Sequence, residues 1–508
     1  MSEVYDLLKS RYFQTGETDW EDIINRVITH IYRDYNKGAS LVARHILMTK
    51  QFIPSSPVLM NAGTRYPMMC SCFVLPVGDS MEQIMSCLTK TALIQKFGGG
   101  VGINFSPIRG DGSPISSTGG QASGPVSFMS FWDAGMNVIR QAGKRQGAML
   151  GVLDWNHPDL QRFLNAKKIE GALTNFNLSV GVRNDTPNKV IEQIAEHTWV
   201  NGEPGLLFLD NINADNRFGV PIVATNPCAE QALPPYGACC LGSINLKSLI
   251  RFEGDSAFFD FDYLEGVLMP TAVNIMNRVL DTCWWPLPEI EEFEMKHRPI
   301  GIGVMGLSDV LIALGMPYGS PAALRFIEHL FIVLNRAGAL ADEFNATRLS
   351  IAPTGSIAMM AGASYSIEPP FNLSGVKKVE IGSFKSENPL VDFAAQAGGY
   401  RMTEKDWEII RETGSALGTE APDEVKAVLR TATEIPPEGH LATLKEVQMY
   451  VDSGVSKTVN CPFSTSPEDI ARYMLWSRDN GIKGVTFYRS GSREDEVFAD
   501  CPTGKCEL

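Results

Sequence analysis

The sequence predicts an α/β fold, either an α/β barrel or a doubly wound sheet, preceded by helices. Helical patterns alternate with short, strand-like apolar runs through residues 185–360, which is typical of a sheet covered by helices. The chain has 508 residues, of which 44% are hydrophobic and 20% charged, and this composition is that of a globular protein. That length suits two or more ordinary domains or one large barrel with additions.

The first half of the chain predicts helices and then strands. Residues 20–28 and 40–48 carry apolar side chains at helical spacing, so the first fifty residues are predicted to be helical. Residues 72–75 form an apolar run that Pro76 ends, which indicates a strand. The glycines at 98–100 predict a tight turn before a buried strand, because glycine allows close backbone approach.

Three segments are predicted to lie at the surface. Residues 107–128 are rich in Gly, Ser and Pro and predict an ordered surface loop. Residues 139–151 form a basic loop, which either holds phosphates or is simply solvated. Residues 375–445 are more charged and less regular, which indicates a surface excursion.

A candidate anion site follows the strand-like run 349–352. There the sequence reads Pro353-Thr354-Gly355-Ser356-Ile357 and leads into a helical pattern. Backbone N–H groups and hydroxyls at a strand-to-helix turn bind phosphate when they face a ligand. An ordinary capped turn is the alternative interpretation.

Charge and cysteine content exclude several classes of protein. The net charge of −14, without a Lys/Arg cluster, argues against binding to nucleic acid polymers. We find neither an apolar run of membrane-spanning length nor a leader peptide, so we expect a cytoplasmic protein. The ten cysteines do not resemble a secreted disulfide framework, and without paired CxxC motifs no metal site is expected.

The strongest chemical signal is Asn226-Pro227-Cys228-Ala229-Glu230. Cys228 lies two residues from both an amide and a carboxylate, and Cys239 follows eleven positions later. This arrangement brings together a reactive sulfur, a proton-transfer group and a redox partner. The alternative is that these cysteines are small buried apolar residues.

A second signal is the pair Cys501 and Cys506 near the C-terminus. Pro, Gly and Lys lie between them, and the polar residues 490–500 that precede them predict a mobile arm. Such an arm lets a dithiol visit both a buried site and an external reductant. A zinc half-site is the alternative, but no matching pair lies nearby.

Together these motifs resemble the catalytic subunit of ribonucleotide reductase. The resemblance runs from Phe52 to the C-terminus and rests on the Asn-Pro-Cys-Ala-Glu segment, the region 233–239, the turn 353–357 and the terminal cysteine pair. It implies a ten-stranded α/β barrel with a central finger loop. On this basis we expect an N-terminal helical segment over 1–50 without an ATP cone, a catalytic barrel over 51–489 and a redox-active tail over 490–508.

The resemblance also implies roles for individual residues. Cys228 would be the thiyl-radical residue at the tip of the finger loop, and Asn226 and Glu230 would bind the ribose hydroxyls and exchange protons with them. Cys72 and Cys239 would reduce the substrate and form a disulfide, with Cys70 and Cys240 as the alternative at each position. Cys501 and Cys506 would then reduce that disulfide. The expected substrate-binding residues are Ser55, Ser56, Ser71, Pro353, Thr354, Gly355, Ser356 and Ile357, and the expected effector loop contains Lys144, Arg145 and Gln146.

The expected activity is reduction of ribonucleotides, diphosphates in particular, to 2′-deoxyribonucleotides. Expected partners are a deoxynucleotide or ATP effector, a thioredoxin- or glutaredoxin-type reductant and a second copy of the chain. Tyr488 is followed by Arg489 rather than by a second tyrosine, which favours adenosylcobalamin as the radical source. The alternative source is a separate ferritin-like subunit, for which Tyr488 is the candidate relay residue. Weaker alternatives are a non-radical thiol oxidoreductase and a silent nucleotide-binding scaffold.

Overall fold

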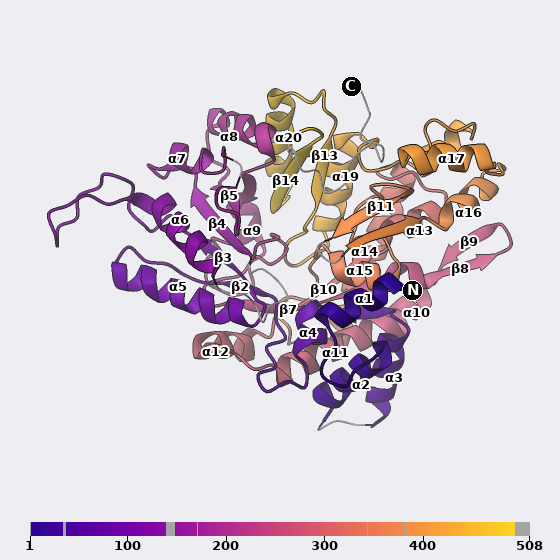
Figure 1. Cartoon of the computed structure of the whole chain (residues 1–508), viewed down its shortest axis with the longest axis horizontal. Helices are drawn as coiled ribbons and strands as arrows, with labels where there is room; N and C mark the ends of the chain where they lie inside the picture. The colour runs from indigo at the N-terminus through magenta and orange to yellow at the C-terminus, as the bar shows by residue number, and fades with distance from the viewer. Residues whose placement is uncertain are drawn as a thin grey trace.

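A computed structural model describes residues 2–33, 37–138, 148–169, 171–342, 344–379 and 382–492. Three helices come first: α1 (Ser2–Arg11), α2 (Trp20–Ile31) and α3 (Lys37–Met48). Helices α2 and α3 pack together at the lower edge of the molecule in Figure 1, and α1 lies above them. In α2, Asp19 caps the first turn and four aliphatic side chains at helical spacing are buried, which confirms the helix expected from the sequence.

The body of the protein is built on a ring of strands. Five parallel strands form one half, in the order β2 (Cys72–Val74), β3 (Gly100–Asn104), β4 (Met149–Asp154), β5 (Phe176–Val182) and β6 (Gly205–Phe208). The other half contains β14 (Gly484–Arg489), β13 (Thr458–Cys461), β10 (Ile300–Met305) and β7 (Ala238–Asn245).

Isolated bridges complete the second half. Ile302 pairs with Leu349, and Ile351 pairs with Val455 just before β13, so residues 349–351 act as a short parallel strand between β10 and β13. The two halves meet in antiparallel contacts of β6 with β14 and of β2 with β7. The described strands therefore close into a ten-stranded barrel, which confirms the fold that the resemblance implied. The short β1 (Phe52–Pro54) pairs with β7 outside this ring.

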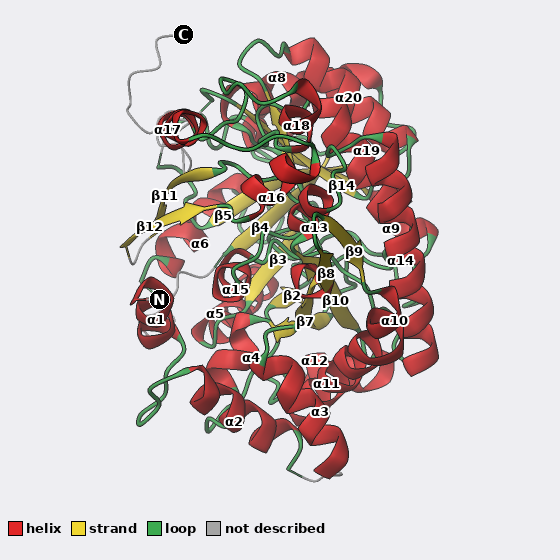
Figure 2. Cartoon of the chain, turned by 90° about the vertical axis from the view of Figure 1, so that its right-hand side faces the viewer, coloured by secondary structure: helices red, strands yellow, loops and turns green. Residues whose placement is uncertain are grey.

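Helices surround the strands (Figure 2). In the first half they are α4 (Ser56–Asn61), α5 (Met81–Lys96), α6 (Gly124–Met136), α7 (Leu160–Leu164), α8 (Asn188–Asn201) and α9 (Leu209–Ala214). In the second half they are α10 (Phe261–Tyr263), α11 (Met269–Thr282), α12 (Pro288–His297), α13 (Leu307–Ala313), α14 (Pro321–Ala341), α15 (Gly355–Ala361), α16 (Leu390–Ala397), α17 (Glu404–Thr413), α18 (Asp423–Val428), α19 (Pro437–Gln448) and α20 (Pro467–Asp479). Shorter elements are the 3₁₀ turn Leu246–Leu249, the π-helical turn Leu264–Leu268 and the hairpins β8 (Ile250–Glu253)–β9 (Ser256–Phe259) and β11 (Ser374–Val379)–β12 (Gly382–Glu387).

Two apolar clusters lie on opposite faces of the barrel strands. The larger cluster fills the space between strands and helices, and it contains Cys70 and Cys240. The smaller cluster contains Cys72, Cys239 and inward-facing aliphatic residues of β2, β4, β6 and β7. Because strand residues alternate between faces, neighbouring cysteines in one strand belong to different clusters.

Three surface expectations were wrong in part. Residues 149–151, at the end of the segment expected as a basic loop, belong to the buried strand β4. Helix α6 begins at Gly124, inside the segment predicted as a loop, because Pro125 is favourable in a first helical turn. The region 375–445 is regular rather than irregular, since it contains α16, α17, α18 and most of α19. In α17, a capping box between Thr403 and Asp406 satisfies the first turn.

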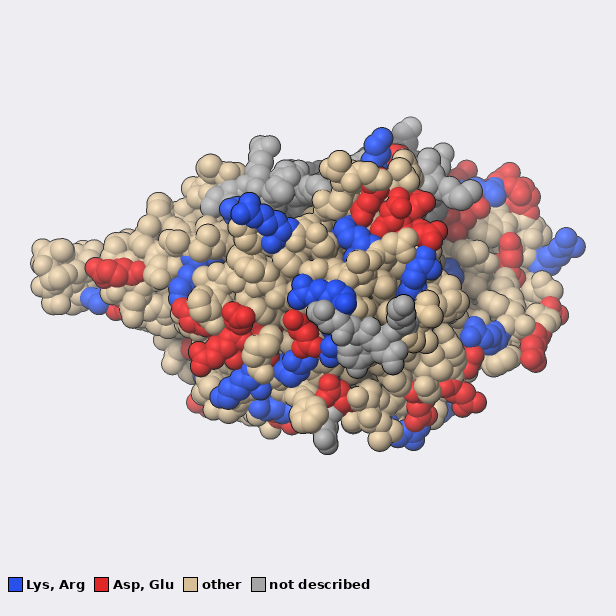
Figure 3. All heavy atoms as spheres, turned by 90° about the horizontal axis from the view of Figure 1, so that it is seen from below, with Lys and Arg blue, Asp and Glu red and all other residues tan. Residues whose placement is uncertain are grey.

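The described surface gives no sign of a polyanion-binding face in the view of Figure 3. Lys and Arg side chains are interspersed there with Asp and Glu. Within the described ranges, no helix combines the length and the apolar character needed to cross a membrane.

Candidate active site

A hairpin-like loop at residues 225–232 carries Cys228 at its tip. Thr225 and Ala232 pair across its base, and the Asn226 side-chain oxygen accepts a hydrogen bond from the Gln231 N–H at 2.9 Å. The turn is tight enough that Ala229 adopts a left-handed backbone conformation with φ of 64°. Cys228 is exposed at this tip, whereas Asn226 is buried.

This loop lies inside the barrel, because strands on several sides of the ring contact it. The backbone of Thr225 comes so close to Gly102 of β3 that a Cβ at position 102 would collide with the Thr225 carbonyl oxygen. A Cβ at Gly454, which precedes β13, would likewise collide with the Ala229 carbonyl oxygen. At both positions any side chain would clash with the loop, so glycine is required for steric reasons and not for its backbone conformation.

Hydrogen bonds from the strands hold the loop in place. Asn177 of β5 donates its side-chain N–H to the Pro227 carbonyl at 2.9 Å. On the other side of the ring, the Ser350 hydroxyl donates to the Glu230 carbonyl at 2.9 Å, and the Gly454 N–H donates to the same oxygen at 2.8 Å. The expected finger loop is thus present and is anchored from both halves of the barrel.

Cys72 and Cys239 lie opposite each other in the antiparallel contact of β2 with β7. We call these two residues the inner thiol pair. The Asn226 amide donates a hydrogen bond to the Cys72 sulfur at 3.0 Å, and the Cys72 thiol donates to Glu230 Oε1 at 3.7 Å. Cys72 therefore meets three residues of the segment 226–239, which lies far from it in the sequence, beside the tip of the loop.

The inner thiol pair is held in its protonated form. Burial raises the pKa of Cys72 well above its ordinary value, and the neighbouring charges of Glu230, Cys239 and Cys228 raise it further. Burial also raises the pKa of Cys239, and Glu294 and Glu230 act in the same direction. Both sulfurs consequently keep an S–H bond at neutral pH, which suits donation of hydrogen atoms.

A cavity of about 310 Å³ opens beside Cys228. It is also lined by Cys72, Asn226 and Glu230. Every residue expected to bind substrate lines this cavity as well: Ser55, Ser56, Ser71, Pro353, Thr354, Gly355, Ser356 and Ile357. The structure therefore brings together residues from β2, the finger loop and the starts of α4 and α15.

Polar groups at one wall of this cavity come from the first turns of α4 and α15. Early helical N–H groups lack intrahelical acceptors and present partial positive charge. The Ser55 hydroxyl is buried and has no hydrogen-bond partner among the described residues. Thr354 adopts a left-handed conformation with φ of 59°, and its hydroxyl accepts a hydrogen bond from the Ser366 N–H at 2.8 Å. Among the described lining residues none is Lys or Arg, so backbone and hydroxyl groups supply the polarity.

A second cavity of about 280 Å³ also reaches Cys228. It is lined by the outer part of the finger loop, by parts of β5 and β6 and by Gly484 and Thr486 of β14. Tyr488 lies on the same face of β14 as these two residues, because side chains alternate along a strand. Cys228 thus borders two cavities, one that is also lined by Cys72 of the inner thiol pair and one that neither member of the pair lines.

Several expected site residues lie outside the described part of the chain. They are Lys144, Arg145 and Gln146 of the expected effector loop and Cys501 and Cys506 of the expected redox tail.

The alternatives at the two thiol positions are separated by the structure. Cys70 and Cys240 are bonded to each other as a disulfide and belong to the larger apolar cluster, between the strands and the helices. Cys72 and Cys239 have free thiols and belong to the smaller apolar cluster, inside the barrel.

Glu294 is a buried acid that sequence reasoning missed. It lies in α12, is fully buried, and accepts the Ala238 N–H at 2.9 Å through Oε1, while Oε2 has no partner among the described residues. Burial raises its pKa well above the ordinary value. In the sequence, Glu294 is one of four glutamates within ten residues, so nothing distinguished it from a solvated helix face.

Comparisons with known proteins agree with this geometry. The family model for the ribonucleotide reductase barrel domain matches residues 70–186, 184–342 and 343–488. A vitamin B12-dependent ribonucleoside-diphosphate reductase from Thermoplasma acidophilum is 39% identical over 506 residues, which cover 89% of this chain and 65% of that protein. One from Mycobacterium tuberculosis (strain CDC 1551 / Oshkosh) is 37% identical, covering 89% of this chain and 72% of that protein.

The fold also matches a solved structure. The class Id ribonucleotide reductase alpha subunit of Actinobacillus ureae superposes with a TM-score of 0.83, covering 97% of both chains at 24% identity. This likeness supports the fold. The family match covers nearly the whole barrel, and the chain therefore belongs to the ribonucleotide reductase family.

Proposed function

We propose that this protein reduces ribonucleotides, with nucleoside diphosphates as substrates, to 2′-deoxyribonucleotides in the cytoplasm. The observation that carries the proposal is the meeting of Cys228, Cys72, Asn226 and Glu230 in one cavity, with Cys239 directly behind Cys72. A 2′-hydroxyl is a poor leaving group, so its removal requires a hydrogen-atom abstractor, proton donors and two reducing equivalents around one ribose.

The roles follow from the positions of the groups. Cys228, as a thiyl radical, removes the 3′-hydrogen atom and returns a hydrogen atom at the end. Asn226 and Glu230 bind the ribose hydroxyls, and Glu230 moves the proton while the 2′-oxygen leaves as water. Cys72 and Cys239 supply two electrons and two hydrogens and form a disulfide, so ribonucleotide and two thiols yield deoxyribonucleotide, disulfide and water. The raised pKa values of this pair support the role, because each sulfur retains its hydrogen.

The starts of α4 and α15 would bind the substrate phosphates. Ser55, Ser56, Thr354, Gly355 and Ser356 line one wall of the cavity, and helix N-termini favour anions. Ser71 lies beside Cys72, where it lines the same space. With the phosphates at this wall, the ribose would reach the finger loop.

The second cavity supports the assignment of the radical source. Its wall of small residues, including Gly205 and Gly484, leaves room beside Cys228 on the side without the inner thiol pair. These residues fit an adenosyl group, and the similar proteins from Thermoplasma and Mycobacterium are named as vitamin B12-dependent. Adenosylcobalamin, when bound, supplies radical chemistry that this chain lacks. A ferritin-like subunit is the alternative source, and Tyr488 would then relay the radical.

The remaining partners follow from the same reaction. Each turnover leaves a disulfide, so a dithiol reductant of the thioredoxin or glutaredoxin type must restore the inner pair, with Cys501 and Cys506 as intermediates. Lys144, Arg145 and Gln146 would connect an effector nucleotide, bound at the interface of a homodimer, with the choice of base.

The test is formation of deoxynucleotide by the purified chain with a ribonucleoside diphosphate, a dithiol and adenosylcobalamin. We expect product, and none from Cys228→Ser. Cys87→Ser is the matched control, because Cys87 is buried in α5 and lines neither cavity. If product forms only when a ferritin-like protein is added, that protein and not adenosylcobalamin supplies the radical. Product from Cys228→Ser would indicate a non-radical thiol oxidoreductase, and binding without turnover under every condition would indicate a scaffold.

A further inference from the structure

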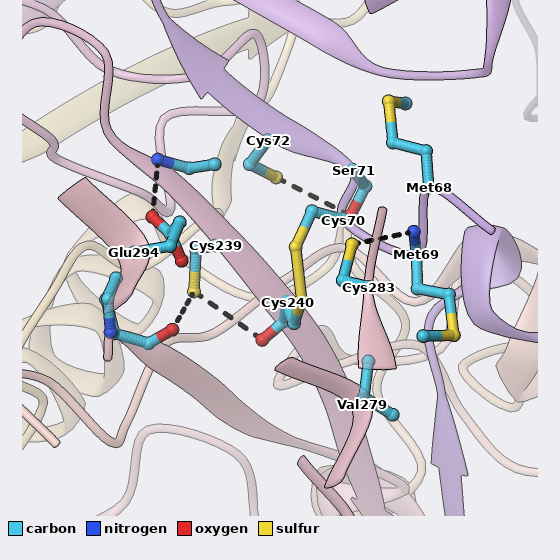
Figure 4. The surroundings of a disulfide bond; sticks show 12 residues. Met68, Met69, Cys70, Ser71, Cys72, Cys239, Cys240, Val279, Cys283 and Glu294 are labelled. Atoms are coloured by element: carbon cyan, nitrogen blue, oxygen red, sulfur yellow. Dashed lines mark hydrogen bonds between the residues drawn. A yellow bond between two sulfur atoms is a disulfide. The ribbon is translucent and has the colours of Figure 1, made fainter. Parts of the chain in front are cut away.

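Three cysteines that the proposed reaction does not use converge behind the inner thiol pair. Cys70 precedes β2, Cys240 lies in β7 and Cys283 follows α11, yet their sulfur atoms all lie within 4.8 Å of one another. We call these residues the outer thiol cluster. Figure 4 shows the Cys283 sulfur beside the disulfide of the other two. Three separate segments of the chain thus contribute one sulfur atom each to the outer thiol cluster.

Hydrogen bonds with the backbone fix the position of the Cys283 sulfur, and one of them is donated by its thiol to the Trp284 carbonyl at 3.5 Å. Its sulfur accepts a hydrogen bond from the Met69 N–H at 3.2 Å. Burial raises the pKa of Cys283 to about 12, but the backbone N–H groups of Met69 and Cys70 act in the opposite direction by favouring the thiolate. Backbone N–H groups aimed at sulfur are outer-shell interactions of the kind that orient metal-bound ligands.

We propose that Cys70, Cys240 and Cys283 form a three-thiolate site for a soft divalent cation such as Zn²⁺, and that the Cys70–Cys240 disulfide is its metal-free, oxidised form. Thiolates select Zn²⁺ over hard cations such as Mg²⁺ and Ca²⁺. A tetrahedral zinc ion at about 2.3 Å from each sulfur needs sulfurs roughly 3.8 Å apart, which the cluster reaches with small side-chain movements. A water molecule would take the fourth position of the tetrahedron.

Reduction followed by metal binding converts the disulfide form into the metal form. A dithiol reductant gives two electrons and two protons to the Cys70–Cys240 bond, becomes a disulfide itself and leaves two thiols. Zn²⁺ then displaces three protons, one from each cysteine, and binds three thiolates. Cys283 contributes nothing to the disulfide, but it is required for the metal site.

Either form would link the same elements. The disulfide joins the approach to β2 with β7, and the metal would add the end of α11. These are the strands that carry the inner thiol pair, so the link keeps Cys72 opposite Cys239 whether or not those two are themselves oxidised. This proposal does not depend on the radical source or on the substrate.

The experiment is a zinc titration of the full chain carrying Cys501→Ser and Cys506→Ser, which removes the competing tail thiols. The protein is reduced with a phosphine under anaerobic conditions, desalted and titrated with ZnCl₂ against a chromophoric chelator. We expect one equivalent of zinc in the reduced protein and none before reduction. Added Cys283→Ser should weaken binding by about 100-fold or more, while Cys87→Ser and Cys72→Ser should not change it.

A second measurement keeps the proposal testable if a variant folds poorly. Co²⁺ in place of Zn²⁺ should give a sulfur-to-metal absorption band in the reduced parent that is lost in Cys283→Ala, with circular dichroism checking the fold. Zinc bound equally well by Cys283→Ser, loss of zinc in Cys72→Ser, or no zinc in the reduced parent would each overturn the proposal. The failure of this site would leave deoxynucleotide formation intact, and so would be distinguishable from failure of the proposed function.

Discussion

The two faces of the contact between β2 and β7 carry cysteines with opposite environments. On the inner face, Cys72 and Cys239 are free thiols, and Cys72 lines the cavity beside Cys228 and contacts an amide and a carboxylate. On the outer face, Cys70 and Cys240 are bonded to each other among apolar side chains. Cys239 and Cys240 are consecutive in β7, so strand alternation directs their side chains to opposite faces. Cys70 and Cys72 are two positions apart, and their environments differ because Cys70 precedes β2 whereas Cys72 is its first residue.

The chemistry of each cysteine is therefore decided by the side of the barrel strands that its side chain faces, and not by the sequence motif around it. The inner pair faces the finger loop, whose anchors span both halves of the barrel. The outer cluster faces helices, where a bond or a metal stabilises the fold. Substitutions on the inner face should therefore change turnover, and those on the outer face should change stability.

The largest effect is expected at Cys228. Cys228→Ser should lower kcat by about 10⁴-fold or more, because an O–H bond cannot replace the hydrogen-abstracting sulfur. Its melting temperature should remain within about 2 °C of the parent, since the residue is exposed at the loop tip. Turnover and thermal unfolding measure the two quantities. A large loss of stability would mean that Cys228 is a packing residue.

The next test exchanges one cysteine on each face. Cys72→Ser should abolish repeated turnover with an external dithiol, because the inner disulfide cannot form. Cys70→Ser should keep kcat within about threefold but should cost roughly 2–5 kcal/mol of stability in the oxidised protein through loss of the Cys70–Cys240 link. Steady-state kinetics measure turnover of both variants, and denaturant unfolding without reductant measures their stability. Loss of turnover in Cys70→Ser, with turnover retained in Cys72→Ser, would show that the outer face carries the catalytic pair.

Gly102→Ala tests whether the finger loop depends on its close contact with β3. The added Cβ would collide with the Thr225 carbonyl, so the loop must move and we expect a cost of about 1–3 kcal/mol together with a lower kcat. Gly135→Ala in α6 is the matched control. It has open space around it and should gain about 0.5–1 kcal/mol. Equal effects of the two substitutions on turnover would contradict the anchored loop.

The smallest effect concerns the buried acid Glu294. Because its pKa is raised in the folded protein, the folded state keeps a proton that the unfolded state releases above about pH 4.5, so stability falls as the pH rises through this range. Glu294→Gln removes this dependence, so its stability relative to the parent should improve from pH 5 to pH 8.

Melting temperatures at both pH values measure this difference. The exposed neighbour Glu292→Gln provides the control. A gap between Glu294→Gln and the parent that stays constant or narrows with rising pH would show that Glu294 is ionised in the folded protein.

Most of the fold and the cavity could be predicted from local motifs. The turn 353–357, the strand at Cys72 and the finger-loop segment each follow local chemistry, and the family resemblance supplied the ring that brings them together. The isolated bridges of residues 349–351 also fit the strand-like run seen there.

The outer thiol cluster and Glu294 could not be predicted. Cys70, Cys240 and Cys283 come from three segments with no metal-ligand spacing, so only the folded barrel brings them together. Glu294 is a buried residue among exposed glutamates of α12, and only the packing of that helix distinguishes it. Within 375–445, α17 was missed because its many charged residues hide a short apolar stripe, and α16 was missed because its eight residues are too few to show a helical period.

The most direct test of the central claim is a single turnover of reduced protein that carries Cys501→Ser and Cys506→Ser, followed by peptide mapping without reductant. We predict about one deoxynucleotide per active site, with Cys72 linked to Cys239 in the same proportion. Product formed while Cys72 and Cys239 both remain free thiols, or a new turnover-dependent bond at Cys70 and Cys240 instead, would contradict the account.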